Sequence, residues 1–278
     1  MKRNTIAALA AVAALLTACI SKETKQDNGN TAPEAWRLDG DRTVYGLACE
    51  GCNDSILVLL PNNGGDPISF DIFEATKNRR ILGKPKIGDE VGVVPNATDT
   101  LKGDVVIDID QLKGIWCYIV MPKLKDAVNL SERAQERLIQ VMEDSIRENY
   151  FIPREYGFAM LRNWAAQSVG YVREQSSLEE ESPVVYPQLG YFTEWHLWNG
   201  KLVITSGTPE VKEDNTTIVD GLINDTCNID YLQGDSLVLS SDGISRAYYR
   251  KNSMTEVNQK ANSIAARLRQ QALEQTKE

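Results

Sequence analysis

Histidine is almost absent from this 278-residue chain, and His196 is the single example. A lone histidine excludes most Ser-His and Cys-His nucleophilic schemes and every metal site built from several histidines. The sequence also has no Gly-x-Ser-x-Gly element, no phosphate-binding Gly-x4-Gly-Lys-Ser/Thr loop and no dinucleotide fingerprint. We therefore expect a non-enzymatic protein with no catalytic residue, metal ligand or cofactor, in which His196 has a structural or surface role.

Basic residues are scarce relative to acidic ones. Lysine and arginine number 30 against 39 aspartates and glutamates, which gives a formal net charge of −9. Nucleic-acid binding needs clustered lysine and arginine to displace counterions from phosphates. Adhesion to anionic lipid needs the same charges. The charge balance therefore argues against both kinds of partner.

The N-terminus carries a short apolar run, Ile6 to Leu16, preceded by Lys2 and Arg3. The run is too short to cross a hydrocarbon core of about 30 Å as a helix. Its basic start, apolar middle and small-residue end are those of a secretory signal, so we expect residues 1–18 to be removed. The polar, aperiodic stretch 19–36 is expected to be a flexible tether.

The end of the signal, "LTAC", resembles the bacterial lipoprotein box. The resemblance implies that Cys19 is acylated and becomes the new N-terminus, so that the lipid bilayer is the first partner. The segment "SKE" that follows Cys19 is similar to the export signals of Bacteroidetes-type lipoproteins. The implied location is the cell envelope, anchored to the outer membrane.

Residues 37–110 show short strand-like runs separated by turn-rich links. Their number and length predict a small β-barrel similar in shape to an OB-fold or SH3 barrel. The expected strands are Thr43–Cys49, Ser55–Leu60, Ile68–Glu74, Glu90–Val94 and Asp104–Ile109. The expected core comprises Ile56, Val58, Phe70, Ile72, Val91, Val93, Val105 and Ile107.

Residues 111–252 predict a second, larger barrel. A capping box at Asn129–Glu132 and apolar residues at helical spacing indicate one inserted amphipathic helix ending near Asn149. A further helix is expected over residues 253–278. Besides the run around Trp116, the expected strands are Tyr156–Asn163, Ser168–Arg173, Tyr191–Trp198, Lys201–Ser206, Thr216–Leu222, Thr226–Leu232, Ser236–Ser240 and Ile244–Lys251. The fold class is therefore mainly β.

The pair Asn199-Gly200 predicts a two-residue type I′ hairpin turn, because both central positions of that turn need positive φ. The turn sets a register in which one sheet face is wholly apolar. That face comprises Trp195, Leu197, Leu202 and Ile204. We expect it to point into the barrel, either as plain core or as the lining of a ligand site.

Gly114-Ile115-Trp116 resembles the Gly-x-Trp motif on the first strand of lipocalins and other calycins. The ending "GDSLVLSSDGISRAYYRK" resembles the closing hairpin of bacterial lipocalin-like lipoproteins. The resemblance implies an eight-stranded barrel in which Arg250 or Arg246 packs over Trp116. It also implies an apolar or amphipathic small molecule as ligand.

Cysteines 49 and 52 form a C-x-x-C element at the end of the first predicted strand. It is similar to the element near the start of NlpE-like envelope lipoproteins, which implies an alternative function: an envelope sensor or assembly factor that works through protein contacts and a Cys49/Cys52 redox pair. Three interpretations stay open, namely a local disulfide, a redox pair and a metal site. Cys117 is expected to face out of the barrel, where a bridge to Cys227 stays open.

Overall fold

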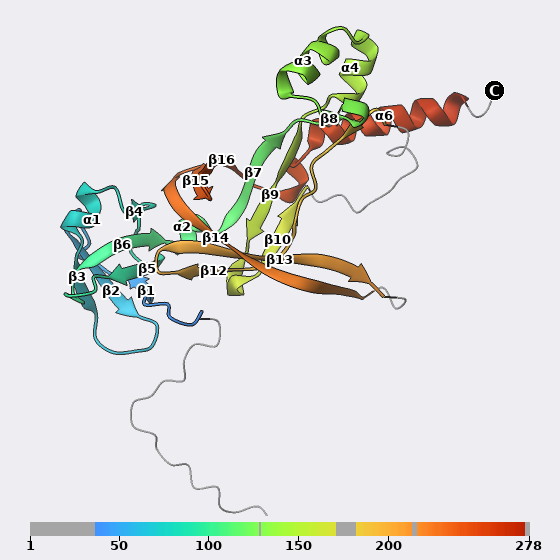
Figure 1. Cartoon of the computed structure of the whole chain (residues 1–278). Coiled ribbons are helices and arrows are strands. Elements are labelled where there is room, and N and C mark those ends of the chain that lie inside the picture. The colour runs from blue at the N-terminus through green and yellow to red at the C-terminus, as the bar shows by residue number, and fades with distance from the viewer. Residues whose placement is uncertain (1–36, 128, 171–181, 213–215, 276–278) are drawn as a thin grey trace, which may run out of the picture. The chain divides into compact units, whose positions relative to one another are not determined.

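The computed structural model describes residues 37–127, 129–170, 182–212 and 216–275. The predicted signal segment and the tether with Cys19 lie outside these residues. Two large β-sheets follow one another along the described chain (Figure 1). In this part of the protein, no helix is long and apolar enough to cross a membrane.

The first sheet has six strands in the order β3-β2-β1-β5-β6-β4, all antiparallel except for the parallel pair β4–β6. The end strand β3 approaches the segment that leads into β6, because Asp71 N donates to Leu101 O at 2.8 Å and Asp71 bridges Lys102. The predicted small barrel is therefore present. Its strands are β1 (Val44–Ala48), β2 (Ile56–Pro61), β3 (Ile68–Asp71), β4 (Ile81–Leu82), β5 (Glu90–Pro95) and β6 (Gly103–Asp108), and its helices are α1 (Phe73–Lys77) and α2 (Ile109–Leu112).

The predicted strand Ile68–Glu74 is too long. It ends at Asp71, whose side-chain Oδ1 accepts a hydrogen bond from Phe73 N at 3.1 Å. This local turn offers the backbone an alternative to the sheet ladder, and α1 begins directly after it.

The predicted core of the first sheet is wrong in β2. Leu57 and Leu59 are buried there, whereas Ile56 is 42% exposed. The strand reads Ile-Leu-Val-Leu-Leu, so apolar residues occupy both faces and alternation cannot choose the inner one. In β6, Val106 is fully buried and Val105 only partly buried, while Ile107 points into the shared core of both sheets.

The second sheet has eight antiparallel strands in the order β10-β9-β7-β16-β15-β14-β13-β12. Its first strand in the chain, β7, pairs with its last, β16. Its ends nearly meet, because Ser168 Oγ donates to Gly190 O and accepts from Phe192 N, both at 2.7 Å. The strands are β7 (Gly114–Val120), β9 (Arg154–Met160), β10 (Ala166–Val169), β12 (Tyr191–Trp198), β13 (Lys201–Val211), β14 (Thr217–Gln233), β15 (Ser236–Ser241) and β16 (Ile244–Lys251).

This strand order is an up-and-down barrel that is almost closed, as the lipocalin-like prediction requires. The register predicted from the Asn199-Gly200 turn is confirmed, with Trp198 opposite Lys201 and Trp195 opposite Ile204. The two strands expected at 216–222 and 226–232 are wrong, since β14 is one continuous strand of 17 residues. The short strands β8 (Lys123–Leu124) and β11 (Val184–Val185) pair outside the barrel.

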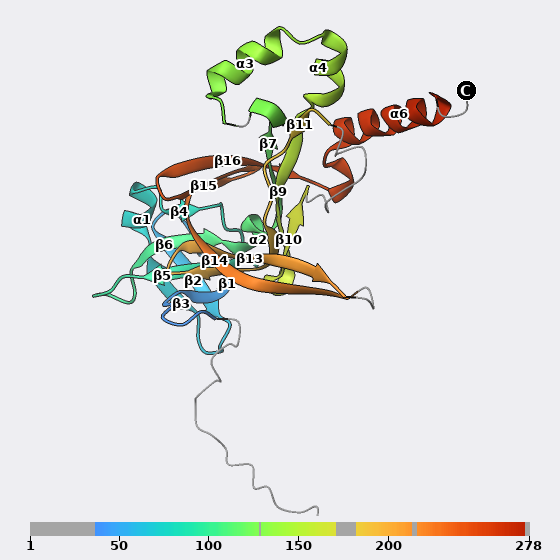
Figure 2. The same cartoon turned by 45° about the vertical axis from the view of Figure 1, so that its right-hand side comes forward.

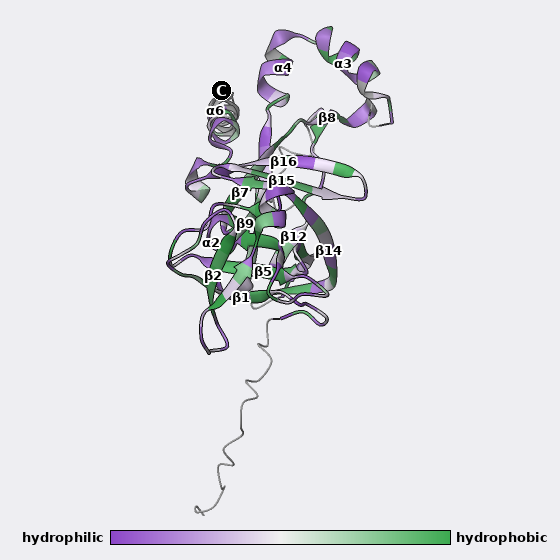
Figure 3. Cartoon of the chain, turned by 90° about the vertical axis from the view of Figure 1, so that its left-hand side faces the viewer, coloured by the Kyte–Doolittle hydropathy of each residue, from purple (hydrophilic) through white to green (hydrophobic). Residues whose placement is uncertain are grey.

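The prediction of one inserted helix is also wrong. The segment forms α3 (Glu132–Gln140) and α4 (Asp144–Tyr150), because Glu143 between them has an extended backbone with ψ of 141°. Val141 is 82% exposed, so the apolar stripe does not pack against the barrel there. Figure 3 shows α3 and α4 as largely hydrophilic. Without a core to pack on, little enforces a single long helix.

The C-terminal helix α6 (Gln259–Gln275) is attached to the outer barrel wall at its start. The Glu155 carboxylate accepts hydrogen bonds from Tyr249 Oη at 2.6 Å and Asn258 N at 2.7 Å, and it pairs with Lys251 Nζ at 2.7 Å. Burial would raise the pKa of Glu155, but these donors outweigh it and hold the pKa below its usual range. Val257 packs beside them on Cys117.

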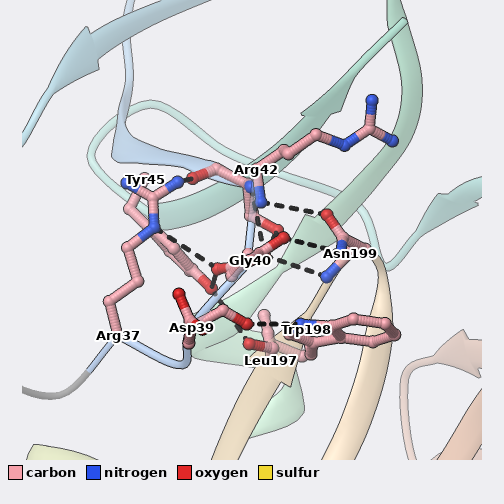
Figure 4. Close-up of polar contacts among 10 residues, drawn as sticks. Arg37, Asp39, Gly40, Arg42, Tyr45, Leu197, Trp198 and Asn199 are labelled. Atoms are coloured by element: carbon pink, nitrogen blue, oxygen red, sulfur yellow. Dashed lines mark hydrogen bonds and ion pairs between the residues drawn. The ribbon is translucent and has the colours of Figure 1, made fainter. Parts of the chain in front are cut away.

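The two sheets meet at a buried carboxylate, Asp41. Figure 4 shows the contacts around it, with Arg42 beside Asn199. The Asp41 side chain is 0% exposed and accepts hydrogen bonds from Thr43 Oγ1 at 2.6 Å, Tyr45 Oη at 2.7 Å and Asn199 N at 2.9 Å. In return, Asn199 Oδ1 accepts from Arg42 N at 2.9 Å. The segment that leads into β1 is thereby tied to the β12–β13 turn.

Candidate functional site

The four residues predicted to line a ligand site do lie together on the inner face of the barrel. Leu197, Leu202 and Ile204 are buried among other core side chains, so they are packing residues. Trp195 differs from them. The residue is only 1% exposed, yet it forms part of the wall of an open cleft at the barrel end nearest the first sheet.

We call this feature the Trp164 cleft. It has a volume of about 510 Å³, within the range of small-molecule sites. Four separate parts of the chain supply its walls: the start of β5, the residue before β7, the β9–β10 connection and β12. The lining residues are Glu90, Lys113, Arg162, Asn163, Trp164 and Trp195.

The apolar floor of the cleft depends on an unusual turn, η2 (Arg162–Trp164). Asn163 and Trp164 have φ values of 58° and 63°, a left-handed backbone that is costly for a tryptophan. The turn is held by Trp195 Nε1, which donates to Leu161 O at 3.0 Å. This backbone brings the Trp164 ring to 4.7 Å from that of Trp195 and 5.8 Å from that of His196, between ring centroids.

His196 therefore has a packing role. Its ring is stacked on Trp164 with an interplanar angle of 19°. Tyr45 closes the cluster edge-on, with its ring centroid 5.9 Å from that of Trp164. Burial and the neighbouring Asp41 charge raise the pKa of Tyr45, so its hydroxyl stays protonated and donates to Asp41.

The two cations of the cleft differ in how they are neutralised. Lys113 Nζ lies 2.6 Å from Glu90 Oε2 and 3.0 Å from Asp110 Oδ1, so two carboxylates balance its charge. Arg162 is exposed, and its guanidinium makes no hydrogen bond or ion pair with any other described residue. The positive charge of Arg162 acts on the carboxylate of Asp110. Burial would raise the pKa of Asp110, but hydrogen bonds from Glu90 N and Lys113 lower it, helped by the charges of Lys113 and Arg162.

The Gly-x-Trp motif lies beneath the cleft and positions Lys113. Arg250 Nη1 donates to Lys113 O at 2.8 Å, and its Nη2 donates to Gln111 O. The same guanidinium lies over the Trp116 ring, and Gly114 leaves room for it. Arg246, the other arginine considered for this role, lies over Tyr118 instead.

Trp164 and Arg162 were not predicted as site residues. The sequence was interpreted as a strand through Asn163, whereas β9 ends at Met160. The available signal was the Arg-Asn pair between two apolar runs, because asparagine tolerates the left-handed backbone that a tight turn needs.

The four cysteines that lie within the described residues form no pairs among themselves. Cys49, Cys52, Cys117 and Cys227 are all free thiols, so the predicted Cys49–Cys52 disulfide is not formed in this structure. Cys52 Sγ instead lies 3.1 Å from Cys49 O and accepts from Val58 N at 3.3 Å. A Cys117–Cys227 bridge is excluded by the fold. Cys117 belongs to the outer-wall cluster with Val257, and Cys227 packs against the barrel core.

No protein-family model matches this chain, and no curated protein matches it. Among solved structures, the chain is similar to a lipocalin-like protein from Bacteroides thetaiotaomicron. The two are 18% identical, and the match covers 50% of this chain and 95% of that chain with a TM-score of 0.25. The lipocalin-like description of the second sheet therefore rests on its strand order.

Proposed function

We propose that this protein is a non-enzymatic lipoprotein, held to the outer membrane of a cell envelope through acylated Cys19, that binds an amphipathic small molecule in the Trp164 cleft. One observation carries the binding proposal: Arg162, whose guanidinium has no hydrogen-bond or ion-pair partner among the described residues, lines the same cleft as Trp164 and Trp195. The two tryptophan rings supply an apolar surface for the body of a small molecule, and the four polar lining residues supply groups that can fix its orientation.

The charges narrow the ligand class to amphipathic anions. Lys113 is already balanced by Glu90 and Asp110, so it is poorly suited to attract a further anion. Arg162 donates to no other described residue, and a guanidinium binds carboxylate or phosphate with two parallel hydrogen bonds. A fatty acid, or a similar carboxylate with an apolar body, fits both the Arg162 guanidinium and the tryptophan rings.

The test is titration of the full-length chain with a panel of fatty acids, sterols and tetrapyrroles, following tryptophan fluorescence. A fatty acid should change the emission, since Trp164 and Trp195 form the floor. Arg162→Glu should weaken fatty-acid binding by about tenfold or more, the loss of one charge-assisted contact. The matched control Arg133→Glu, on exposed α3, should change affinity by less than about twofold.

Trp164→Ala should abolish the fluorescence change while leaving a folded barrel, because the ring is only partly buried. If no panel member alters the emission, the cleft is not the binding site. If a fatty acid binds and Arg162→Glu leaves its affinity unchanged, the anionic class is wrong.

A second function is favoured by the state of the thiols. Cys49 and Cys52 are free, partly exposed and three positions apart, which suits a redox pair in an envelope sensor or assembly factor. Its test is the reduction potential of the pair, measured by thiol trapping in glutathione buffers. A potential below about −300 mV would make it a structural disulfide instead.

A further inference from the structure

The strand β14 extends well beyond its neighbour β15. It pairs with β13 over most of its length, but with β15 only from Asn228 to Gln233. Residues Thr217–Asp225 therefore have β13 on one edge and no other strand from the described residues on the opposite edge. Figures 1 and 2 both show this half of the β13–β14 hairpin projecting past the neighbouring strands.

We call residues Thr217–Asp225 the free edge. An unpaired edge offers a row of backbone N–H and C=O groups to another extended chain. Proteins usually block such edges with short strands, lysine or proline. The free edge contains neither lysine nor proline, and it exposes three large aliphatic side chains, of which Leu222 (60%) and Ile223 (62%) are more exposed than Ile218 (37%).

Leu222 and Ile223 flank the edge on opposite faces, because neighbours in a strand alternate. Leu222 lies on the face of Gly207, where its Cδ2 is 3.1 Å from the position a Gly207 Cβ would occupy. Gly221, with φ of 63°, and the register shift between Ser206 and Thr208 form a bulge next to it. The bulge at Gly221 divides the free edge into two regular segments. The segments available for pairing are Thr217–Asp220 and Leu222–Asp225.

The charge around the free edge is strongly negative. The described residues between Thr208 and Thr226 contain three acidic residues, Glu210, Asp220 and Asp225, and a single basic one, Lys212. Within the free edge itself, Asp220 and Asp225 are exposed. A second copy of the chain would bring the same acidic hairpin against this one. Like charges placed opposite each other in a sheet are destabilising, so self-pairing is disfavoured and a basic strand is favoured.

We propose that the free edge of β14 is a docking site for an extended, basic segment of a partner protein, which adds as a strand through backbone hydrogen bonds. The partner segment would place lysine or arginine near Asp220 and Asp225 and aliphatic residues against Leu222 and Ile223. This mode of recognition takes affinity from the main chain and specificity from alternate side chains. The surface is separate from the Trp164 cleft and does not depend on it.

The experiment selects binders to the full-length chain from a displayed library of random nine-residue peptides. The enriched peptides should be basic, with β-branched or aliphatic residues alternating with lysine or arginine. Adding such a peptide should slow hydrogen exchange by about tenfold or more at those amides of residues 217–225 that point away from β13, since new ladder bonds protect them. Methylating alternate backbone nitrogens of the peptide should lower its affinity by about tenfold, because its charge is kept while hydrogen bonds are lost.

The variant Asp220→Lys with Asp225→Lys should weaken binding by about tenfold. The control Glu136→Lys with Glu148→Lys changes the net charge equally at exposed sites on α3 and α4, and should alter affinity by less than about twofold. Exchange protection elsewhere in the chain, or full affinity of the methylated peptide, would overturn the proposal. So would protection of residues 217–225 that rises with protein concentration in the absence of peptide, which would identify a second copy as the occupant.

Discussion

The guanidinium carbon of Arg250 lies 4.2 Å from the centre of the Trp116 ring, and the two residues face each other on the paired strands β16 and β7. Trp116 is fully buried and its Nε1 donates to Leu112 O at 2.8 Å. Arg250 donates to the carbonyls of Gln111 and Lys113. The pair therefore joins β16 to the turn that leads into β7. The hydrogen bond from Arg250 to Lys113 O also sets the position of Lys113 in the Trp164 cleft.

Replacing Arg250 with lysine should lower the free energy of unfolding by about 1–3 kcal/mol, because an ammonium cannot donate to both carbonyls while covering the ring. Urea unfolding followed by circular dichroism measures this change. The matched variant is Arg246→Lys on the same strand, where the arginine is exposed over Tyr118. Arg246→Lys should lower the free energy of unfolding by less than about 1 kcal/mol. Equal losses in the two variants would contradict a special role for Arg250.

Gly114 should tolerate no side chain. Its φ is 134°, and a Cβ there would lie 2.2 Å from Arg250 Nη1. Gly114→Ala should therefore destabilise the chain by about 2–4 kcal/mol through backbone strain and displacement of the guanidinium. Gly234 also has positive φ but has open space around it. Gly234→Ala should cost only about 1 kcal/mol, and thermal unfolding of the two variants compares them directly.

Glu155 should make the attachment of α6 sensitive to acid. Its folded pKa is lowered, so its stabilising contribution is present above its ordinary pKa of 4.5 and is lost as the pH falls through the folded value. Glu155→Gln should lower the free energy of unfolding by about 1–3 kcal/mol at pH 7. The difference in unfolding free energy between this variant and the unmodified chain should shrink toward pH 3. Urea midpoints across this pH range test the sign. For the exposed control Glu210→Gln, no such convergence is expected.

Cys117 should resist alkylation in the folded, reduced chain at pH 8. Burial and the nearby Glu155 charge raise the pKa of its thiol to about 12, and the residue is 0% exposed. The thiolate is the reactive form, so little is present at pH 8. Mass spectrometry after iodoacetamide should find Cys49 modified and Cys117 intact until the protein is unfolded. Equal labelling of both in the folded state would place Cys117 at an accessible position.

Cys19→Ala should release the protein from the membrane. If acylation of Cys19 is the anchor, the variant loses its acyl chains, and the apolar run Ile6–Leu16 is too short to replace them. Detergent-phase partitioning of the expressed protein distinguishes the two forms. Unchanged partitioning of the variant would show that the anchor lies elsewhere.

The sequence by itself determined the features whose cause is local. Asn199-Gly200 specified the turn and thereby the inner face with Trp195 and Leu202, because few residue pairs accept positive φ twice and side chains alternate along a strand. The order of the strands followed from the spacing of apolar runs and turn residues.

Tertiary structure decided what local patterns leave open. The inner face of β2 was undetermined because Ile56–Leu60 is apolar on both sides, and the inserted helix broke because its apolar stripe meets no core. The Trp164 cleft needs a left-handed turn next to Trp195 and Lys113, which are 31 and 51 positions from Trp164 in the sequence. Only the closing of the barrel brings these residues together, since no short-range pattern specifies a contact across that distance.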